Sequence, residues 1–305
     1  MISIIIPFYK FTFFEETLQS LVNQTDKRFK VYIGDDASPE NPAALLDKYN
    51  GQLDLIYQRF ETNLGGISLV QQWDRCIALS ADEEWLMILG DDDVLSSHCI
   101  EEFYKNQEEI KKNNCNVIRF ATIEIDGDSK IISKEYTHPK LEKATDSLYR
   151  KFFKKSRGSL SEQIFKRKAY DKHGFFNYGL AWYADDRAWL EFSESHSIYT
   201  INSAVVNFRI SNENISRGGY KQKEKQDVKF QFFNFLIFSF LEKFDKEQKK
   251  YFLLEYELMV YKIRKATFRF WFSLFLLILK NINLTQAIKF SRRYLIHLNK
   301  NATTT

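Results

Sequence analysis

The sequence opens with Met1-Ile2-Ser3-Ile4-Ile5-Ile6-Pro7, and the β-branched run that ends at Pro7 is typical of a strand buried on both faces of a sheet. Thr12 and Glu15 have the spacing of a capping box, which predicts a helix over 12–23. The alternation continues with strands expected over 30–34, 53–58 and 85–89 and with helices expected over 42–49 and 68–80. Strands that alternate with helices predict an α/β fold with a largely parallel sheet and right-handed crossovers.

Two groups of aspartates follow strands in this pattern. Asp35-Asp36 ends the second strand, and Asp91-Asp92-Asp93 follows the fourth. Ligands of parallel sheets bind beyond the carboxyl ends of the strands, so we expect both groups to face one crevice. Neighbouring buried carboxylates repel each other, and a hard cation such as Mg²⁺ or Mn²⁺ would compensate their charge. The alternative is a helix N-cap, although one aspartate is enough for that role.

The middle of the chain departs from this alternation. We expect a helix over 97–113, followed by a hairpin of strands 116–125 and 130–136 around the turn signal Asp126-Gly127. The basic stretch 143–157 has little regular pattern and predicts a mobile loop.

The last third of the chain has a different character. Residues 159–210 predict short strands with one helix near 186–192, whereas beyond Gly218-Gly219 the residues Phe, Leu, Lys and Glu recur at helical spacing. We therefore place a boundary between a domain over 1–217 and a helical region over 218–305.

Composition excludes several classes of protein. The three cysteines are odd in number and widely spaced, so neither a disulfide framework nor a zinc knuckle is indicated, and a reducing compartment fits best. The first residues lack the basic segment of a signal peptide. The longest apolar stretch, 270–279, is about half as long as the roughly 20 residues that a membrane-spanning helix needs.

Three motifs give the first 95 residues a resemblance to the family 2 glycosyltransferases of the GT-A fold. They are Ser3-Ile4-Ile5-Ile6-Pro7-Phe8-Tyr9, Asp35-Asp36-Ala37-Ser38 and Leu89-Gly90-Asp91-Asp92-Asp93, in the order and spacing of the family. The resemblance implies a GT-A catalytic domain over 1–217, with a nucleotide-binding half over 1–95 and an acceptor half over 96–217. Its centre would be a mostly parallel nucleotide-binding sheet flanked by helices.

The resemblance also implies which residues bind the donor. Pro7 and Tyr9 would line the pocket of the nucleobase, and Asp36, with Asp35 beside it, would bond the base or the ribose. The turn Asn63-Leu64-Gly65-Gly66 is similar to the family's Asn-x-Gly turn, which implies that Asn63 and Gly65 lie near the diphosphate. Asn and Gly also mark any tight turn, so this motif is weak on its own.

Asp91, Asp92 and Asp93 correspond to the family's acidic motif and are the candidate ligands of a Mn²⁺ or Mg²⁺ ion at the donor's diphosphate. Such an ion would act as a Lewis acid that stabilises the charge gathering on the leaving group. Family members usually have Asp where this chain has Gly90, which would shift the ligand set to Asp91 and Asp93.

Transfer to an acceptor also needs a base that takes the proton of the attacking hydroxyl. The family supplies it from an acidic pair that opens a late helix, and the similar stretch here is 176–187. The resemblance implies Asp186 as the base and Asp185 as its neighbour or an acceptor contact, whereas the alternative is again a helix cap. Trp182 and Tyr183 would form a platform for the acceptor sugar, although aromatic residues at such positions are as often part of a core.

A second departure lies near the end of the catalytic domain. Asn207-Phe208-Arg209-Ile210-Ser211 resembles a family segment in which an Arg is followed two residues later by a His. Ser211 takes the His position, whereas Arg209 could still pair with a phosphate of the donor.

The C-terminal region is strongly basic, because no Asp or Glu follows Glu257. Aromatic and aliphatic residues recur there at helical spacing, which fits either a packed helix or an interfacial helix that rests on anionic lipid. The absence of acidic residues favours peripheral membrane contact through 260–300. No motif supports nucleic-acid binding.

The sequence therefore predicts a metal-dependent, inverting glycosyltransferase of the hexosyltransferase type. By family analogy the donor is a UDP-sugar rather than a GDP- or dTDP-sugar, and the acceptor is a glycan or lipid-linked hydroxyl in capsule, O-antigen or exopolysaccharide biosynthesis. The enzyme would be cytoplasmic, with peripheral contact at the inner face of the membrane.

Two other functions stay open. A catalytically inactive nucleotide-sugar-binding or membrane-assembly subunit is supported by the departures at Gly90 and Ser211. A sugar nucleotidyltransferase would share the sheet and the metal. Its Gly-rich loop after the first strand is not matched by Pro7-Phe8-Tyr9-Lys10.

Overall fold

The computed structural model describes residues 1–153, 155–179, 181–211, 222–263 and 267–302. The chain divides into two compact units, Met1–Tyr220 and Lys221–Thr305. The domain boundary expected at Gly218-Gly219 lies outside the described residues.

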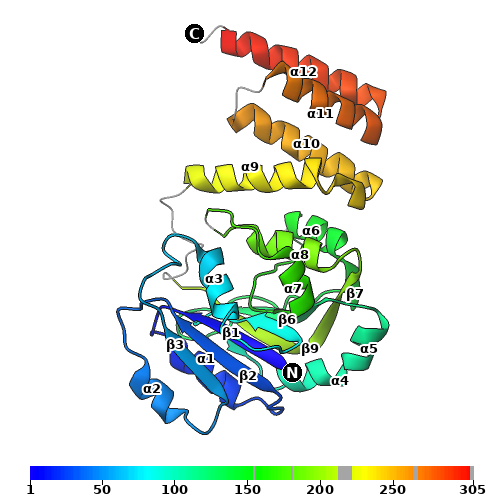
Figure 1. Ribbon diagram of the computed structural model, residues 1–305. Coiled ribbons are helices and arrows are strands. Elements are labelled where there is room, and N and C mark those ends of the chain that lie inside the picture. The colour runs from blue at the N-terminus through cyan, green and yellow to red at the C-terminus, as the bar shows by residue number, and fades with distance from the viewer. Residues whose placement is uncertain (154, 180, 212–221, 264–266, 303–305) are drawn as a thin grey trace. The chain divides into compact units, whose positions relative to one another are not determined.

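One mixed sheet forms the centre of the first unit (Figure 1). Nine strands belong to it in the part of the unit that is described: β1 (Ile2–Phe8), β2 (Phe29–Asp35), β3 (Leu55–Arg59), β4 (Trp85–Ile88), β5 (Val94–Leu95), β6 (Val117–Ile125), β7 (Leu141–Lys143), β8 (Gln163–Lys166) and β9 (Ser197–Arg209). Their order is β3-β2-β1-β4-β8-β6-β9-β5, and β7 pairs with β9. Helices cover both faces of the sheet: α1 (Phe14–Val22), α2 (Ala43–Lys48), α3 (Leu69–Ile77), α4 (Cys99–Lys105), α5 (Gln107–Lys112), α6 (Ala144–Phe152), α7 (Arg167–His173) and α8 (Ala184–Phe192).

The parallel half of the sheet consists of the apolar stretches that the sequence predicted as strands. β1 pairs in parallel with β2 and β4, and β2 pairs in parallel with β3. The isoleucines of β1 are 0% exposed, as expected of a strand covered by helices on both faces. The register sets Phe8 beside Asp35 and Asp35 beside Arg59, so these three strands end at the same edge. The predicted α/β fold with a mostly parallel sheet is confirmed.

The start of α1 corrects one prediction. The helix begins at Phe14, and its N-cap is Phe13, whose side chain makes no capping bond. The capping box expected from Thr12 and Glu15 is therefore wrong. Glu15 and Glu16 instead lie in the first turn, where their charges favour the positive end of the helix dipole.

The middle of the chain contains more regular structure than the sequence suggested. The basic stretch expected as a mobile loop forms β7 and α6, because Ala144 and Leu148 lie one helical turn apart and both are buried. The helix expected over 97–113 is interrupted at Asn106, which separates α4 from α5. Of the expected hairpin, β6 is present, but 130–136 makes only isolated bridges.

The second unit is helical, as predicted. Its described part contains α9 (Gln222–Phe238), the short 3-10 helix η3 (Leu241–Lys243), α10 (Lys246–Ile263), α11 (Phe268–Asn281) and α12 (Leu284–Ala302). Phe230 of α9 stacks on Tyr256 of α10 with ring centroids 5.6 Å apart, and Phe232, Phe233 and Phe252 are fully buried. Among the helices that the structure describes, none combines the length and the apolar character needed to cross a membrane.

Candidate active site

Asp36, just beyond the end of β2, organises a neighbouring turn with its carboxylate. The carboxylate accepts hydrogen bonds from the backbone amides of Leu64 (2.7 Å) and Gly65 (2.8 Å) and forms an ion pair with Arg75 of α3. A Cβ atom at Gly65 would lie 2.6 Å from Asp36 Oδ2, so the turn requires glycine at this position. Ala37 follows with a φ of 55°, a strained conformation of the kind that gathers at functional sites.

Other predicted donor residues lie at the same edge of the sheet. The side-chain oxygen of Asn63 accepts a 2.6 Å bond from the amide of Gly66, which closes the turn held by Asp36. Pro7 lies in β1, and the carbonyl oxygen of Tyr9 accepts a 2.7 Å bond from the Ser38 hydroxyl. Tyr9 is 38% exposed, so its ring is accessible at the edge.

Asp35 is fully buried and its carboxylate is bonded within the protein. It accepts hydrogen bonds from the hydroxyl of Tyr57 (2.5 Å), the guanidinium of Arg59 (2.8 Å) and the amide of Ser38 (2.7 Å). Burial, together with the bond to Asp35, raises the pKa of Tyr57 to about 12. Asp35 therefore supports this edge from inside the protein, and Asp36 beside it is also buried, at 4% exposed.

The acidic loop, residues 90–93 between β4 and β5, is joined to the end of β1 by Asp91. Its Oδ2 atom accepts hydrogen bonds from the backbone amides of Tyr9 (2.8 Å) and Lys10 (2.9 Å). Burial raises the pKa of Asp91, and the two amide bonds oppose that shift. Through these bonds the first and fourth strands hold their loops side by side.

Asp92 and Asp93 both have raised pKa values, because nearby cations and hydrogen-bond donors offset the effect of burial only in part. Burial, and then the charges of Asp93 and Asp91, raise the pKa of Asp92 to about 8. Burial raises the pKa of Asp93 to about 6, although Ser161 and the amide of Arg209 bond to this carboxylate. A Cβ atom at Gly90 would lie 3.0 Å from both Asp92 Oδ1 and Asp93 Oδ2, so the two carboxylates converge beside this glycine.

Arg209 is buried and forms hydrogen bonds to the acidic loop and to residues beside it. The residue is 0% exposed, and its side chain donates to the Asp92 carbonyl (2.9 Å), the Asp126 carbonyl (3.0 Å), the Ser129 hydroxyl (2.9 Å) and the Glu16 carboxylate (2.7 Å). Its backbone amide donates to Asp93 at 2.9 Å. In this conformation the guanidinium donates its hydrogen bonds to protein groups at the loop instead of presenting donors to a phosphate.

The residues near Gly90 fit a divalent cation, although none of the described residues form a cluster of three or more His, Cys, Asp or Glu side chains around one point. Two converging carboxylates with raised pKa values are stabilised by a hard cation, and Mg²⁺ or Mn²⁺ commonly takes its other ligands from phosphate and water. Asp92 and Asp93 are the residues that would hold it. Asp91 is a poorer candidate than the sequence implied, because its Oδ2 is engaged by two backbone amides.

A second acidic pair lies at the start of α8. Ala181 and Tyr183, just before the helix, have φ values of 55° and 64°, which turns the chain so that Asp185 and Asp186 fall in the first helical turn. Asp186 is 7% exposed and accepts a 2.6 Å bond from the ammonium of Lys151 of α6. Burial, and then the charge of Asp186, raise the pKa of Asp185 to about 7, against the opposing charge of Lys151.

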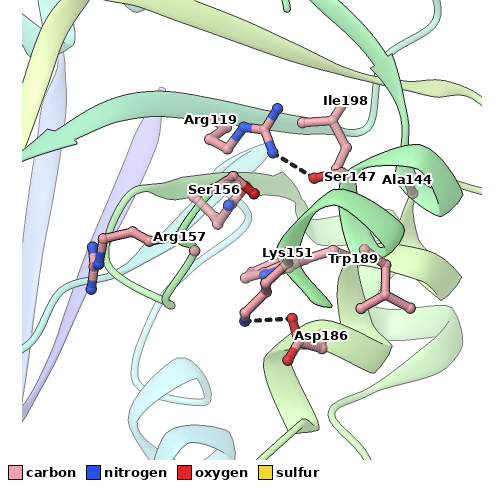
Figure 2. Close-up of a pocket in the computed structure, with 12 residues that line it drawn as sticks. Arg119, Ala144, Ser147, Lys151, Ser156, Arg157, Asp186, Trp189 and Ile198 are labelled. Atoms are coloured by element: carbon pink, nitrogen blue, oxygen red, sulfur yellow. Dashed lines mark hydrogen bonds and ion pairs between the residues drawn. The ribbon is translucent and has the colours of Figure 1, made fainter. Parts of the chain in front are cut away.

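A cavity of about 30 Å³ lies beside Asp186, and Figure 2 shows residues that line it. Lys151 and Asp186 lie on its wall, and Arg119 on the wall donates a 2.6 Å bond to Ser147. Arg119 Nε and Gln163 Oε1 are buried without a hydrogen-bond partner among the described residues. The cavity therefore offers a donor and an acceptor to a small polar group.

The two aromatic residues of the predicted acceptor platform are partly buried. Tyr183 stacks on Phe152 of α6 with ring planes within 1° and centroids 6.5 Å apart, and Trp182 packs edge-on against Tyr183 at 6.5 Å. Burial raises the pKa of Tyr183 to about 12. Their rings adjoin the second acidic pair, and part of each remains accessible.

Ser161 and Glu162, just before β8, connect the two acidic groups. The Ser161 hydroxyl accepts a 3.1 Å bond from the Gly90 amide, and, against the larger effect of burial, its proximity to Asp93 lowers the pKa of that carboxyl. Glu162 is 0% exposed, and its charge acts on both Asp93 and Asp185. Sequence reasoning missed these two residues and Lys151, because their importance comes from contacts with residues far away in the chain.

The α/β sheet, with acidic loops at the carboxyl ends of its parallel strands, defines a GT-A type of nucleotide-binding fold. The chain belongs to glycosyl transferase family 2, whose model matches residues 3–174, more than half of its length.

Solved structures of S. aureus TarS share this fold. A structure of TarS 1-349 in complex with UDP-GlcNAc is 14% identical with a TM-score of 0.64, covering 92% of this chain and 81% of that one. A structure of TarS 1-349 in complex with UDP is 16% identical with a TM-score of 0.55, covering 86% and 80%. The TarS structure without a stated truncation is 13% identical with a TM-score of 0.62, covering 94% and 49%. A search of curated proteins finds no match to this chain.

Proposed function

We propose that this protein transfers a sugar, with inversion, from a UDP-sugar to a hydroxyl group of a glycan or lipid-linked acceptor. The observation that carries the proposal is that the segment 156–163 lies against both acidic groups: the Ser161 hydroxyl accepts a 3.1 Å bond from the Gly90 amide, and Gly158 and Gln163 line the same cavity as Asp186. In this proposal a donor held at the first group has its anomeric carbon toward the second. UDP as the nucleotide is supported by the TarS structures, which were obtained with UDP-GlcNAc and UDP.

The donor side of the site would use the edge formed by β1 and β2. Tyr9 would contact the nucleobase with its exposed ring, and the turn held by Asp36 would lie beside the diphosphate. Asp92 and Asp93 would hold Mn²⁺ or Mg²⁺, and family 2 enzymes commonly use divalent metals. When bound, such an ion supplies Lewis-acid stabilisation of the departing diphosphate.

The acceptor side would use α8. Asp186 would take the proton of the acceptor hydroxyl as that oxygen attacks the anomeric carbon and the bond to the diphosphate breaks. One displacement with one base inverts the anomeric configuration, whereas retention needs a second carboxylate placed as nucleophile. Trp182 and Tyr183 would contact the acceptor sugar, as the sequence predicted. The acceptor would belong to a capsule, O-antigen or exopolysaccharide pathway on the cytoplasmic side of the membrane.

Release of nucleoside diphosphate from a panel of UDP-, GDP- and dTDP-sugars with Mn²⁺ tests the proposal. Wild type should release UDP, and Asp186→Asn should slow that release by at least about a hundredfold, because a general base is typically worth that much. Asp171→Asn, at an exposed position of α7, is the matched control and should behave as wild type. Tight donor binding without release from any donor would favour the inactive-subunit alternative that Gly90 and Ser211 suggest.

We further propose that the second unit contacts anionic lipid through α11. Phe268, Phe272, Leu276 and Leu279 are 73%, 51%, 46% and 37% exposed and lie along one face, whereas Trp271, Leu274 and Ile278 on the other face are buried. The cations of α11 are Arg269 and Lys280, of which Lys280 pairs with Glu242 at 2.9 Å, and no Asp or Glu follows Glu257 in the sequence. An exposed apolar stripe flanked by cations is the pattern of a helix that lies in a membrane interface.

Sedimentation with vesicles tests the lipid contact. The full chain should bind vesicles of phosphatidylglycerol more tightly than vesicles of phosphatidylcholine, and salt should weaken the binding. Phe272→Ser should weaken it, whereas Leu258→Ser, at an equally exposed position of α10, should not. Equal binding of both variants to phosphatidylglycerol would refute the role of α11.

A further inference from the structure

Lys151 is the counter-ion of the second acidic pair. Its Nζ atom lies 2.6 Å from Asp186 Oδ1, and the two side chains are 31% and 9% exposed. Figure 2 shows that Lys151 comes from α6 and Asp186 from α8, so the bond joins two separate helices at the wall of the cavity. A bond of this length between charged groups in a mostly buried place fixes the direction of the carboxylate.

The other cations at the cavity are paired elsewhere. Arg119 donates a 2.8 Å bond to Glu142, and Arg157 lies 3.3 Å from Glu124. The charged and titratable groups that face the acidic pair are therefore Lys151 from α6, Glu162 from the segment before β8, and Tyr183 from the turn before α8. Of these, Lys151 supplies the positive charge.

We infer that Lys151 is a positioning residue for the base proposed above: its ammonium holds the Asp186 carboxylate in one orientation at the cavity wall and supplies the positive charge that faces the acidic pair. The inference rests on the proposed function, because it concerns the base of the same reaction. It adds a residue from a segment that the sequence alone predicted to be a loop. It also explains why a buried aspartate is tolerated beside a partly buried one there.

The protonation equilibria agree with this assignment. Burial alone would lower the pKa of Lys151, but the charges of Asp186 and Asp185 outweigh that effect and raise it, so the ammonium stays charged at neutral pH. Among the described residues the ammonium bonds to Asp186 and not to Asp185, and burial raises the pKa of Asp185 to about 7.

The test compares wild type with Lys151→Met, which removes the charge, and Lys151→Arg, which keeps it. The measurement is kcat/KM for UDP release as a function of pH. In Lys151→Met the midpoint of the acidic limb should move up by about one pH unit, because an opposite charge at this distance shifts a carboxyl by that order. Lys151→Arg should keep the wild-type midpoint. An equal loss of activity at every pH would overturn the inference.

Lys140→Met is the matched control. Lys140 also forms a 2.6 Å ion pair, with Glu109, but both side chains are more than 40% exposed and lie away from the cavity. Its pH profile should match wild type. A shift of the same size in this control would overturn the inference, because it would show that any lost surface charge moves the profile.

Thermal unfolding gives a second measurement that does not depend on activity. Without its counter-ion the buried pair binds protons more tightly in the folded chain, so the loss of Tm in Lys151→Met should be larger at pH 8.5 than at pH 5.5. An equal loss at both pH values would overturn the inference. If wild type releases no nucleotide from any donor, the proposed function fails by itself, and the pH dependence of Tm still decides whether Lys151 sets the charge of the pair.

Discussion

The backbone amide of Arg209 donates a 2.9 Å hydrogen bond to the carboxylate of Asp93, a residue 116 positions earlier in the chain. The same arginine reaches the carbonyl of Asp92 with its side chain. The end of β9 thereby fixes the acidic loop that follows β4. This arrangement makes Arg209 a structural support of the candidate cation site. The sequence alone suggested only that Arg209 pairs with a phosphate of the donor.

Replacing Arg209 by Met should destabilise the fold rather than only weaken donor binding. The substitution leaves buried carbonyl oxygens without donors, which costs about 2–3 kcal/mol for bonds to a charged group. Urea unfolding measures the difference. Lys130→Met removes an exposed pair with Asp128 near the same turn and should change stability by less than about 0.5 kcal/mol. A variant with wild-type stability but no affinity for UDP would instead assign Arg209 to the phosphates.

Binding of Mn²⁺ should release protons and strengthen as the pH rises. The pKa of Asp93 is about 6 and that of Asp92 about 8, in both cases chiefly because of burial. A ligand must lose its proton to bind a metal, so the apparent affinity should rise by up to about tenfold per pH unit between these values. Calorimetry in two buffers of different ionisation enthalpy measures the protons released. No release at pH 7 would exclude both carboxylates as ligands.

The same shifts set the pH dependence of stability without metal. Both carboxyls have a higher pKa in the folded chain than the 3.8 of an ordinary Asp, so folding takes up protons. Their contribution is most favourable below about pH 4 and is lost as the pH rises through about 6 and then 8. Asp92→Asn should flatten this fall in Tm, whereas Asp171→Asn should not. Parallel curves for wild type and Asp92→Asn would contradict the prediction.

The sequence predicted the parallel half of the fold well, because local pattern and tertiary burial agree there. The β-branched run after Met1 predicted the strand β1, and the motif Asn63-Leu64-Gly65-Gly66 predicted a turn; both are present. The aspartates after β2 and β4 lie at one edge of the sheet, as expected. That these residues bind a donor stays a prediction.

Other features depend on contacts that no local pattern contains. α6 is rich in basic residues and was expected as a loop, yet burial of Leu148 and the pair between Lys151 and Asp186 hold it in place. Asp35 looked equivalent to Asp36 in the motif. Both are buried, and only their partners distinguish them: Asp35 bonds to Tyr57 and Arg59, whereas Asp36 bonds to the turn at Leu64 and Gly65.

Gly65→Ala should disturb the turn that Asp36 holds. The added Cβ atom would lie 2.6 Å from Asp36 Oδ2, so the carboxylate or the turn must move, at a cost of about 1–3 kcal/mol. Urea unfolding and UDP titration measure the loss of stability and of donor affinity. Gly127→Ala is the control, because its Cβ would meet only Phe13 at an ordinary 3.8 Å. Equal behaviour of the two variants would show that the turn is not constrained as the structure indicates.

Tyr9→Ala should weaken UDP binding by about tenfold, the usual worth of one aromatic contact with a base. Asp35 is buried and bonded to Tyr57 and Arg59, so under the proposed function the exposed ring at the end of β1 would recognise the base. Tyr9→Phe keeps that ring and should bind UDP within about twofold of wild type, because stacking does not need the hydroxyl. Calorimetric titration with UDP measures both. If Tyr9→Phe loses as much affinity as Tyr9→Ala, the hydroxyl and not the ring makes the contact, and the base lies elsewhere along this edge.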